Sequence, residues 1–527
     1  MPDERTLPVT SKYRWRILSL LFVATTINYM DRSVIGVLAP TLQYKVFHWS
    51  DVDYANINVA FKVAYAIGML AMGALIDRFG TRIGYTLSIA IWSIFGMLHA
   101  LVKPAFSLIG FIVARFGLGF GEAGNFPSAI KTVAEWFPKK ERAYATGIFN
   151  AGSNIGAILA PLIIPLIVMS NGDNWQYAFL VTGIFSAIWV VFWLKTYKKP
   201  EVHPRVSAAE LAHINSDDVK GSEPATKIPW SKVLPKKETW AFAIGKITDA
   251  VWWFYLFWGG KYLFDQFGLN IKHLALPLII IYLIADVGSI VGGWLSGFFM
   301  KKGWVLNRAR KTTLFICALF ILPVMFVTQI KTAFRTDDAF YQKISLATYK
   351  TEKDTVVNGK EETITVRTKI SPENMEKLYT LKGNSYSSAK SFITDVTTVI
   401  PQDGINSFEN ILMEGARANN YYWIAVLLIA FAAAGHQAWS ANLFTLVSDV
   451  FPKKATASVT GIGGMVGAVS GIVADYTLGQ ALKSSGASGY FFAFLIAGMM
   501  YLIILFFIHL IMPKMTPLDE NLNHIKT

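Results

Sequence analysis

The chain has 527 residues, of which 53% are hydrophobic and only 16% are charged. Soluble domains usually carry about 25% charged residues, so this composition, with its long apolar runs, predicts a polytopic membrane protein. The net charge of +14 is spread over the loops between apolar runs, which argues against a nucleic-acid-binding protein. A single cysteine, Cys317, rules out an internal disulfide.

Twelve apolar stretches are long enough to cross a bilayer as helices, which takes roughly 20 residues each. We read the first as a retained span, because it contains charged residues and lacks the cleavage site of a signal peptide. The expected spans lie at about residues 15–41, 53–76, 83–102, 106–134, 142–168, 175–196, 239–266, 273–299, 311–331, 421–447, 456–482 and 489–512.

The spans divide into two halves. Phe137-Pro138-Lys139-Lys140 and Phe451-Pro452-Lys453-Lys454 each enter a glycine-rich span, with Gly147 and Gly461 nine residues after the respective prolines. Two repeated six-span halves are typical of carriers that rock about a site at the membrane midplane. We expect an N-terminal bundle over 1–196, a proline-containing cytoplasmic linker over 197–238 and a C-terminal bundle over 239–527.

Lysine and arginine collect in alternate loops, which predicts a multi-pass cell (inner) membrane protein with both termini in the cytoplasm.

A polar segment over 332–420 interrupts the second half on the outer side. An Asn358-Gly359 turn between alternating residues predicts a hairpin there, and Ser371-Pro372 predicts a capped helix start. We therefore expect a small extracytoplasmic insertion.

The first span carries Asn28-Tyr29-Met30-Asp31-Arg32 at its centre. A charged side chain there costs about 2.5 to 3.5 kcal/mol on insertion scales, so Asp31 and Arg32 are candidate functional residues. The alternative is that these two residues simply pair with each other or lie at a helix end.

Arg115 and Glu122 lie two helical turns apart on the fourth span and therefore share a face, which we expect to meet Asp31 and Arg32 across a cavity. An arginine fork binds a carboxylate through two parallel bonds, and a buried carboxylate can take up a proton. This set suits a proton-coupled anion carrier, or else a static salt-bridge network.

The fourth span also contains Gly119-Phe120-Gly121-Glu122-Ala123-Gly124, which we interpret as a site of close helix packing rather than a dinucleotide-binding loop.

Other polar side chains inside spans extend this cavity. Lys62 either adds positive charge to it or reaches outward to the membrane surface, and Tyr29 and Tyr65 offer hydroxyl groups. In the seventh span, Trp252 and Tyr255 suit the faces of a sugar ring, although a membrane-interface belt of aromatic residues explains them as well. Polar groups that are costly in lipid also occur on the fifth and tenth spans, at Asn150, Ser153, Asn154, His436, Gln437, Ser440 and Asn442.

The loop between the second and third spans reads Gly73-Ala-Leu-Ile-Asp77-Arg78-Phe-Gly80-Thr-Arg82. Its glycines permit a turn, and its charges can pair across the cytoplasmic face; an ordinary basic loop is the alternative. This loop closely resembles the signature of the major facilitator superfamily, and the resemblance extends to the twelve-span layout.

Three further stretches, Asn28 to Arg32, Gly119 to Gly124 and Glu135 to Arg142, resemble the anion:cation symporter branch of that superfamily. Val251 to Trp258 and His436 to Phe444 resemble the bacterial hexuronate transporters, which import glucuronate and galacturonate with protons. The insertion at 332–420 is longer than the loop usual in that family.

This resemblance implies that Asp31 and Glu122 carry protons and that Arg32 and Arg115 organise the site and its carboxylate. It also implies that Gly73, Asp77 and Arg78 belong to a latch for the outward-facing state. It implies substrate contacts from Tyr29, Tyr65, Asn150, Gln437, Ser440 and Asn442. To these we add Trp252, Tyr255 and His436 from the aromatic and polar clusters of the seventh and tenth spans.

We therefore expect a monomeric, proton-coupled importer of hexuronates that needs no cofactor or metal and binds no nucleic acid. The alternatives are a carrier of another organic anion, such as an aldonate, and a sensor that binds a sugar acid without moving it. An enzyme would need a nucleophile–base pair or a metal-ligand set, and no such spacing appears.

Overall fold

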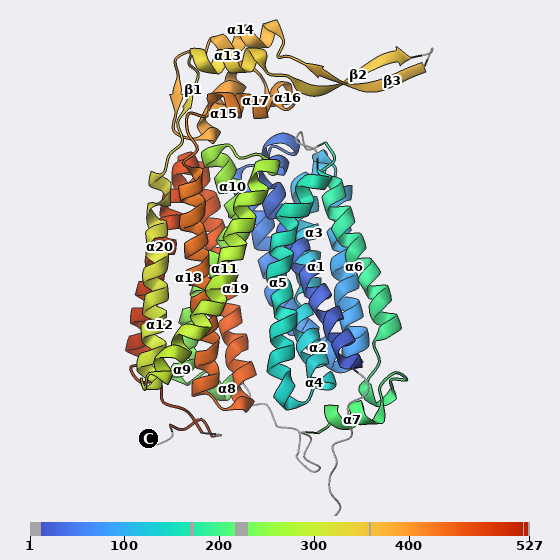
Figure 1. Ribbon diagram of the computed structural model, residues 1–527, viewed down its shortest axis with the longest axis vertical. Helices are drawn as coiled ribbons and strands as arrows, with labels where there is room; N and C mark the ends of the chain where they lie inside the picture. The colour runs from blue at the N-terminus through green and yellow to red at the C-terminus, as the bar shows by residue number, and fades with distance from the viewer. Residues whose placement is uncertain (1–11, 169–172, 217–229, 358–359, 520, 525–527) are drawn as a thin grey trace, which may run out of the picture.

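The computed structural model describes residues 12–168, 173–216, 230–357, 360–519 and 521–524. Long helices form two bundles that lie side by side (Figure 1). The first bundle contains α1 (Tyr13–Pro40), α2 (Asp51–Leu98), α3 (Ser107–Glu122), α4 (Asn125–Trp136), α5 (Lys139–Ile167) and α6 (Gln176–Thr196). The second contains α9 (Lys237–Gly245), α10 (Asp249–Phe267), α11 (Ile271–Lys301), α12 (Leu306–Ile321), α18 (Tyr422–Val450), α19 (Lys453–Ser485) and α20 (Gly489–Ile511).

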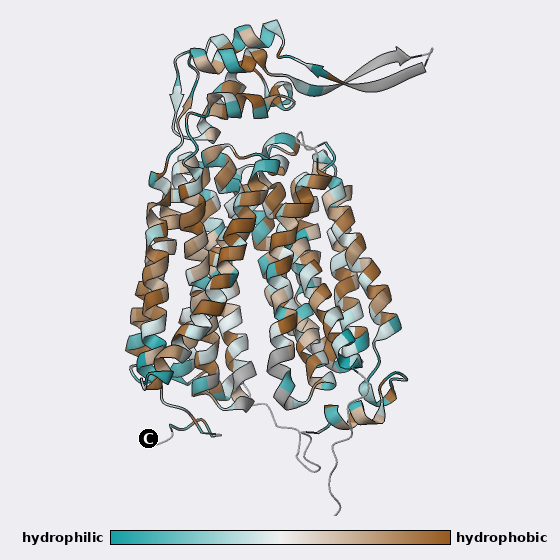
Figure 2. Cartoon of the chain, in the orientation of Figure 1, coloured by the Kyte–Doolittle hydropathy of each residue, from teal (hydrophilic) through white to brown (hydrophobic). Residues whose placement is uncertain are grey.

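Among the described residues, nine stretches are long and apolar enough to cross a membrane, and the last of them, Ser458–Ile511, spans both α19 and α20. Helices α1 and α10 complete the set of twelve. The prediction of an all-helical membrane protein with twelve spans is confirmed. Figure 2 shows hydrophobic residues predominating along the bundle helices.

Local signals place the helix ends. A capping box at Ser50 and Asp53 begins α2, whose direction changes at Gly80, where φ is +78°. Gly268, with φ +66°, closes α10 in the left-handed conformation, and the side chain of Asn270 then caps α11. The predicted turn after the second span therefore depends on Gly80, whereas Gly73 stays helical.

Two short helices, α7 (Ala208–Ile214) and α8 (Trp230–Val233), lie in the stretch between the bundles, of which residues 217–229 are outside the described chain. The carboxylate of Glu210 on α7 accepts hydrogen bonds from the backbone N–H groups of Tyr13 and Arg14, at 3.1 and 3.0 Å. This carboxylate satisfies the first backbone donors of α1, as a negative group at a helix N-terminus does.

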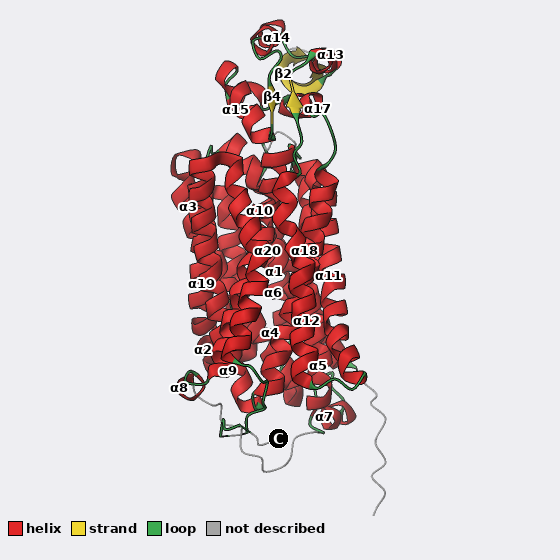
Figure 3. Ribbon diagram, turned by 90° about the vertical axis from the view of Figure 1, so that its left-hand side faces the viewer, coloured by secondary structure: helices red, strands yellow, loops and turns green. Residues whose placement is uncertain are grey.

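An insertion stands beyond one end of the bundles, opposite the described ends of the chain (Figures 1 and 3). The predicted hairpin is present, because Val357 pairs with Lys360, although Asn358 and Gly359 themselves lie outside the described residues. Ser371 caps the predicted helix. The elements of the insertion are β1 (Phe334–Arg335), α13 (Asp338–Leu346), β2 (Tyr349–Val357), β3 (Lys360–Thr368), α14 (Pro372–Tyr379), β4 (Ser385–Tyr386), α15 (Ala389–Val399), α16 (Gln402–Ile405) and α17 (Glu409–Ala416).

We call the end of the bundles that carries this insertion the insertion end. The two bundles touch closely near it: a Cβ atom at Gly36 of α1 would lie 2.4 Å from the carbonyl oxygen of Leu256 on α10. The hydroxyl of Tyr54 on α2 donates to the carbonyl oxygen of Phe257, 2.5 Å away. Helix α2 also packs along α19, and α5 packs along α11.

Close helix packing inside the first bundle yields a test of stability. A Cβ atom at Gly156 of α5 would lie 2.2 Å from the carbonyl oxygen of Thr26, so Gly156→Ala must push α5 away from α1. We expect a loss of about 1 to 3 kcal/mol, visible as a lower unfolding temperature of the purified protein in detergent. Gly147→Ala is the matched control on the same helix, because nothing lies within 4 Å of its Cβ position. Equal unfolding temperatures for the two variants would contradict this packing.

Candidate functional site

The charged centre of α1 forms an ion pair with the fourth span. Nε of Arg32 lies 2.8 Å from Oε2 of Glu122, and the side chains of both residues are almost completely buried. The Asn28 side-chain oxygen accepts a longer bond from Arg32, at 3.5 Å. The alternative in which Arg32 pairs with its neighbour Asp31 is therefore wrong, because the guanidinium reaches across to α3.

Four aromatic rings surround the Arg32 guanidinium, and we call them the aromatic box. Its carbon lies 4.6 Å from the ring centre of Tyr29 and 4.9 Å from that of Tyr65. The rings of Phe61 and Trp253 are both 5.3 Å away. Aromatic faces attract cations, so the box helps to hold a charge that burial would otherwise disfavour. Trp253 belongs to α10, so both bundles contribute to the box.

Arg115 is fully buried beside this box, with its guanidinium carbon 4.4 Å from the centre of the Phe61 ring. Within the described chain, none of its three guanidinium nitrogens has a hydrogen-bond partner. A buried polar group without a partner calls for an explanation, and a buried cation does so most of all. A guanidinium fork matches the two oxygens of a carboxylate.

Asp31 faces a different part of the first bundle. Its Oδ2 accepts a hydrogen bond from the Ser186 hydroxyl on α6, at 2.8 Å, and Trp92 donates to the same hydroxyl oxygen, at 2.9 Å. Asp31 is 4% exposed, and no cation of the described chain lies within ion-pair distance of it. The two acids predicted to share one cavity thus have separate environments, Glu122 beside arginine and Asp31 beside hydroxyl and indole groups.

Lys62 forms a second ion pair, and this pair joins the two bundles. Its Nζ lies 2.7 Å from Oδ2 of Asp475 on α19 and 3.0 Å from the carbonyl oxygen of Gly471. The indole of Trp258 donates to the other carboxylate oxygen of Asp475, at 3.0 Å. Lys62 is 2% exposed, so the alternative in which it reaches outward to the membrane surface is wrong.

The predicted residues of the second bundle lie in two places. Trp252 stacks on His436, with ring centres 5.8 Å apart, and His436 bonds to the Tyr501 hydroxyl at 2.7 Å. Asn442 instead donates to the carbonyl oxygen of Gly292, at 2.7 Å, and so joins α18 to α11. Tyr255 is buried, Gln437 and Ser440 are half-buried, and Asn150 is exposed on α5.

The predicted latch residues lie at the end of the bundles opposite the insertion. Arg78 is exposed and lies against its neighbour Phe79, with the guanidinium carbon 5.5 Å from the ring centre. Gly73 is half-buried, and the side chain of Asp77 lies outside the described part of the chain. The latch remains a prediction.

Three residues of this site, Phe61, Trp253 and Asp475, were not among those predicted from the sequence. Asp475 carried a usable signal, because a carboxylate inside an apolar span is the feature that singled out Asp31. Trp253 stood beside the selected Trp252, and only the rotation of α10 about its axis decides which ring faces Arg32.

The glycine-rich stretch of the fourth span packs tightly, as expected. A Cβ atom at Gly119 would lie 2.5 Å from the carbonyl oxygen of Phe61, and one at Gly121 would lie 2.6 Å from the backbone nitrogen of Trp92. These contacts bring α3 against α2, which places Arg115 and Glu122 next to Phe61. The interpretation of these glycines as a packing motif is confirmed.

The sequence profile of the Major Facilitator Superfamily matches residues 21–336, which is more than half of the chain and ends just inside the insertion. A galacturonate transporter of Dickeya chrysanthemi is 33% identical over 59% of this chain and 89% of its own length. A hexuronate transporter of Escherichia coli is 33% identical over 59% of this chain and 71% of its length. A D-galactonate transporter of Escherichia coli O6:H1 is 30% identical over 58% of this chain and 72% of its length.

Among solved structures, a bacterial homologue of the human lysosomal transporter Spinster, in an inward-facing and unoccupied conformation, has a similar fold. The TM-score is 0.62 over 95% of this chain and 96% of that one, at 16% sequence identity.

The Lys62–Asp475 pair makes a testable contribution to stability. Asp475→Leu leaves a buried ammonium without its carboxylate, and we expect the variant to lose about 3 to 5 kcal/mol of stability. The double variant Lys62→Met with Asp475→Leu should recover most of that loss, because it removes both charges. Thermal unfolding of the native chain, both single variants and the double variant in detergent measures the coupling. Additive losses in the double variant would contradict a direct pair.

Proposed function

The chain belongs to the Major Facilitator Superfamily, whose members are transporters rather than enzymes, and on that premise we propose that it imports hexuronates together with protons. The observation that carries this proposal is Arg115, a fully buried guanidinium without a hydrogen-bond partner in the described chain, beside an arginine that is already paired. The names of the galacturonate and hexuronate relatives support the choice of substrate.

We propose that the insertion end faces the outside of the cytoplasmic membrane and that both chain termini face the cytoplasm. The distribution of lysine and arginine among the loops supports this orientation. The bundles touch closely near the insertion end, so this structure would correspond to a carrier closed toward the outside. Gly73, Asp77 and Arg78 would form their latch when the carrier opens the other way.

Arg115 would bind the carboxylate of the sugar acid through its fork. The hydroxyls of Tyr29 and Tyr65, which lie at the aromatic box, would bond the sugar hydroxyl groups. Asn150, Gln437 and Ser440 would complete these contacts, because none of them is fully buried in this state. Trp252, Tyr255, His436 and Asn442 are more remote candidates, since Asn442 and His436 already have partners within the second bundle.

Proton coupling would depend on the Arg32–Glu122 pair. When Glu122 takes up a proton, Arg32 loses its carboxylate partner and becomes a second cation for the substrate anion. One proton and one monoanion bind together, so the loaded site would carry the same net charge as the empty one, and loading would add no charge to be moved through the closed state. Asp31 accepts a hydrogen bond from Ser186 and forms no pair with Arg32, so it would take up and release a proton independently of Glu122. All these groups belong to one chain, so a monomer would be sufficient for transport.

An aldonate is the second candidate substrate. The D-galactonate transporter of Escherichia coli O6:H1 is 30% identical to this chain, only slightly less similar than the hexuronate relatives. Both substrate classes carry one carboxylate and several hydroxyl groups, which the same arginine and tyrosines would bind.

Uptake into vesicles containing the purified chain tests the transport proposal. An inward proton gradient of one pH unit, at one proton per monoanion, should accumulate labelled galacturonate or glucuronate about tenfold. Glu122→Gln should abolish this accumulation but retain counterflow exchange, because exchange needs no net proton movement. If galactonate alone accumulates, an aldonate replaces the hexuronates as the proposed substrate. If sugar acids bind but are not transported, the proposed transport function is wrong.

The role of Arg115 is tested by conservative replacement. Arg115→Lys keeps the charge but loses the fork, so we expect the KM for the sugar acid to rise about 10- to 150-fold, corresponding to the roughly 1.5 to 3 kcal/mol of a charged hydrogen bond. Arg115→Met should lose binding altogether. Arg205→Lys, at an exposed linker position, is the control. An unchanged KM in Arg115→Lys would remove this residue from the binding site.

A further inference from the structure

The insertion belongs structurally to the second bundle but contacts the first. It follows η6 (Leu322–Gln329) and leads directly into α18, so both of its attachments lie in the second bundle. Its hydrophobic core is separate from that of the bundles and includes Phe334, Phe340 and Phe392, together with Phe264 of α10. Apart from the β2–β3 hairpin, which extends to one side (Figure 1), the insertion thus packs against α10.

Two ion pairs nevertheless connect the insertion to the first bundle. Nζ of Lys390 on α15 lies 2.8 Å from Oδ2 of Asp51, the first residue of α2. Oε2 of Glu409 on α17 lies 2.7 Å from Nζ of Lys45, in η1 (Thr41–Val46) at the end of α1. Lys45, Asp51 and Glu409 are all less than 10% exposed. These are interior contacts, unlike the solvent-exposed pairs that contribute little to stability.

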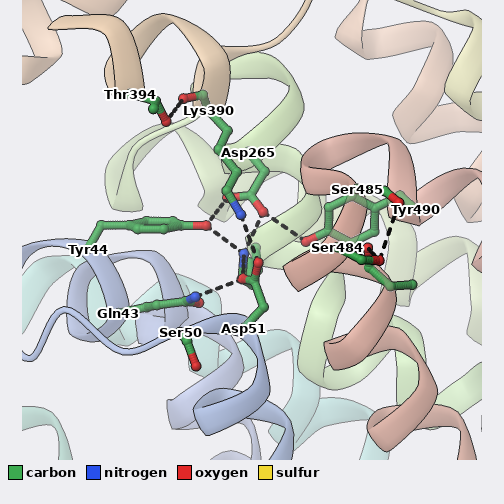
Figure 4. Close-up of polar contacts among 12 residues, drawn as sticks. Gln43, Tyr44, Ser50, Asp51, Asp265, Lys390, Thr394, Ser484, Ser485 and Tyr490 are labelled. Atoms are coloured by element: carbon green, nitrogen blue, oxygen red, sulfur yellow. Dashed lines mark hydrogen bonds and ion pairs between the residues drawn. The ribbon is translucent and has the colours of Figure 1, made fainter. Parts of the chain in front are cut away.

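Both bundles continue this network at the insertion end (Figure 4). Lys261 of α10 lies 2.9 Å from Oδ1 of Asp51 and 2.5 Å from Oδ2 of Asp265. The hydroxyl of Tyr44 donates to Asp265 at 2.6 Å, and that of Tyr490 on α20 donates to the same carboxylate at 3.0 Å. The network thus joins both bundles and the insertion at one place.

The charges of this network balance, with ammonium groups at Lys45, Lys261 and Lys390 and carboxylates at Asp51, Asp265 and Glu409. A cavity of about 260 Å³ lies beside Lys390, but the ammonium groups of the network already have carboxylate partners, so an anion would gain no surplus charge there. Burial alone would lower the pKa of Lys390, but Asp265 and Asp51 outweigh it and raise that pKa, so the ammonium stays charged. A neutral, interior and fully paired network is suited to holding segments together.

We propose that the insertion is a strap that holds the outer side of the transport path closed, through Lys390 on Asp51 and Glu409 on Lys45. This proposal rests on the proposed alternating access. Opening the insertion end requires the first bundle to leave the second, and the strap contacts must break in that step. A contact made in only one of two states shifts the equilibrium toward that state.

The strap is tested by removing its two charges together, in Lys390→Met with Glu409→Gln, which keeps the network neutral. The matched control is Lys377→Met with Glu373→Gln, which removes an exposed ion pair inside the same insertion, 2.7 Å long in the native chain. Each double variant removes one positive and one negative charge from the insertion, but only the first removes ion pairs with the first bundle.

The measurement is the rate at which a maleimide labels Ala55→Cys in a Cys317→Ala background, with the full chain purified in detergent. Ala55 of α2 is 1% exposed and faces Gly479 of α19, so it is shielded only while the bundles touch near the insertion end. We expect at least fivefold faster labelling in the strap variant and no change in the control variant. An unchanged rate in the strap variant would overturn the proposal.

A reporter inside the first bundle separates gate opening from general loosening. Ala178 on α6 is fully buried, and α6 packs against α1 and α2 of its own bundle. Equal acceleration at Ala178→Cys would indicate loosening and would also overturn the strap. The assay contains no substrate, so failure of sugar-acid uptake by the native chain would leave its result interpretable.

Discussion

The cost of placing charge in hydrocarbon governs the centre of this protein. The Arg32–Glu122 pair meets that cost with a carboxylate at 2.8 Å and with the rings of the aromatic box. Lys62 meets it with Asp475, across the boundary between the bundles. Arg115 differs from both, since it has aromatic contacts but no hydrogen-bonded partner within the described chain. A bound carboxylate ligand would give the Arg115 guanidinium the anionic partner that Arg32 and Lys62 already have.

Contacts between the bundles occur at two depths. Within the bundles, Lys62 binds Asp475, and Trp253 faces Arg32. At the insertion end, Asp51 is shared between Lys261 of the second bundle and Lys390 of the insertion. A rocking carrier needs contacts that differ between its two states, and charged pairs provide this because they lose their partners when the bundles separate. The proposed strap adds the insertion to that set.

Small residues make the charged centre geometrically possible. Gly119 and Gly121 allow α3 to approach α2 closely, which brings Arg115 and Glu122 beside Phe61. Gly471 has the same role for Lys62, because a Cβ atom there would lie 3.2 Å from Nζ. Packing of the backbone and pairing of the charges are therefore coupled in this fold.

Apolar length and misplaced charge are local properties, so the amino-acid sequence was enough to predict the twelve spans and to select Arg32, Arg115 and Glu122. It did not determine which charges pair. The folded arrangement pairs Glu122 with Arg32 and Asp475 with Lys62, since pairing depends on how each helix is rotated and tilted against its neighbours. The contact of the insertion with the first bundle was likewise invisible in the sequence, because it joins segments more than 300 residues apart, Asp51 and Lys390 among them.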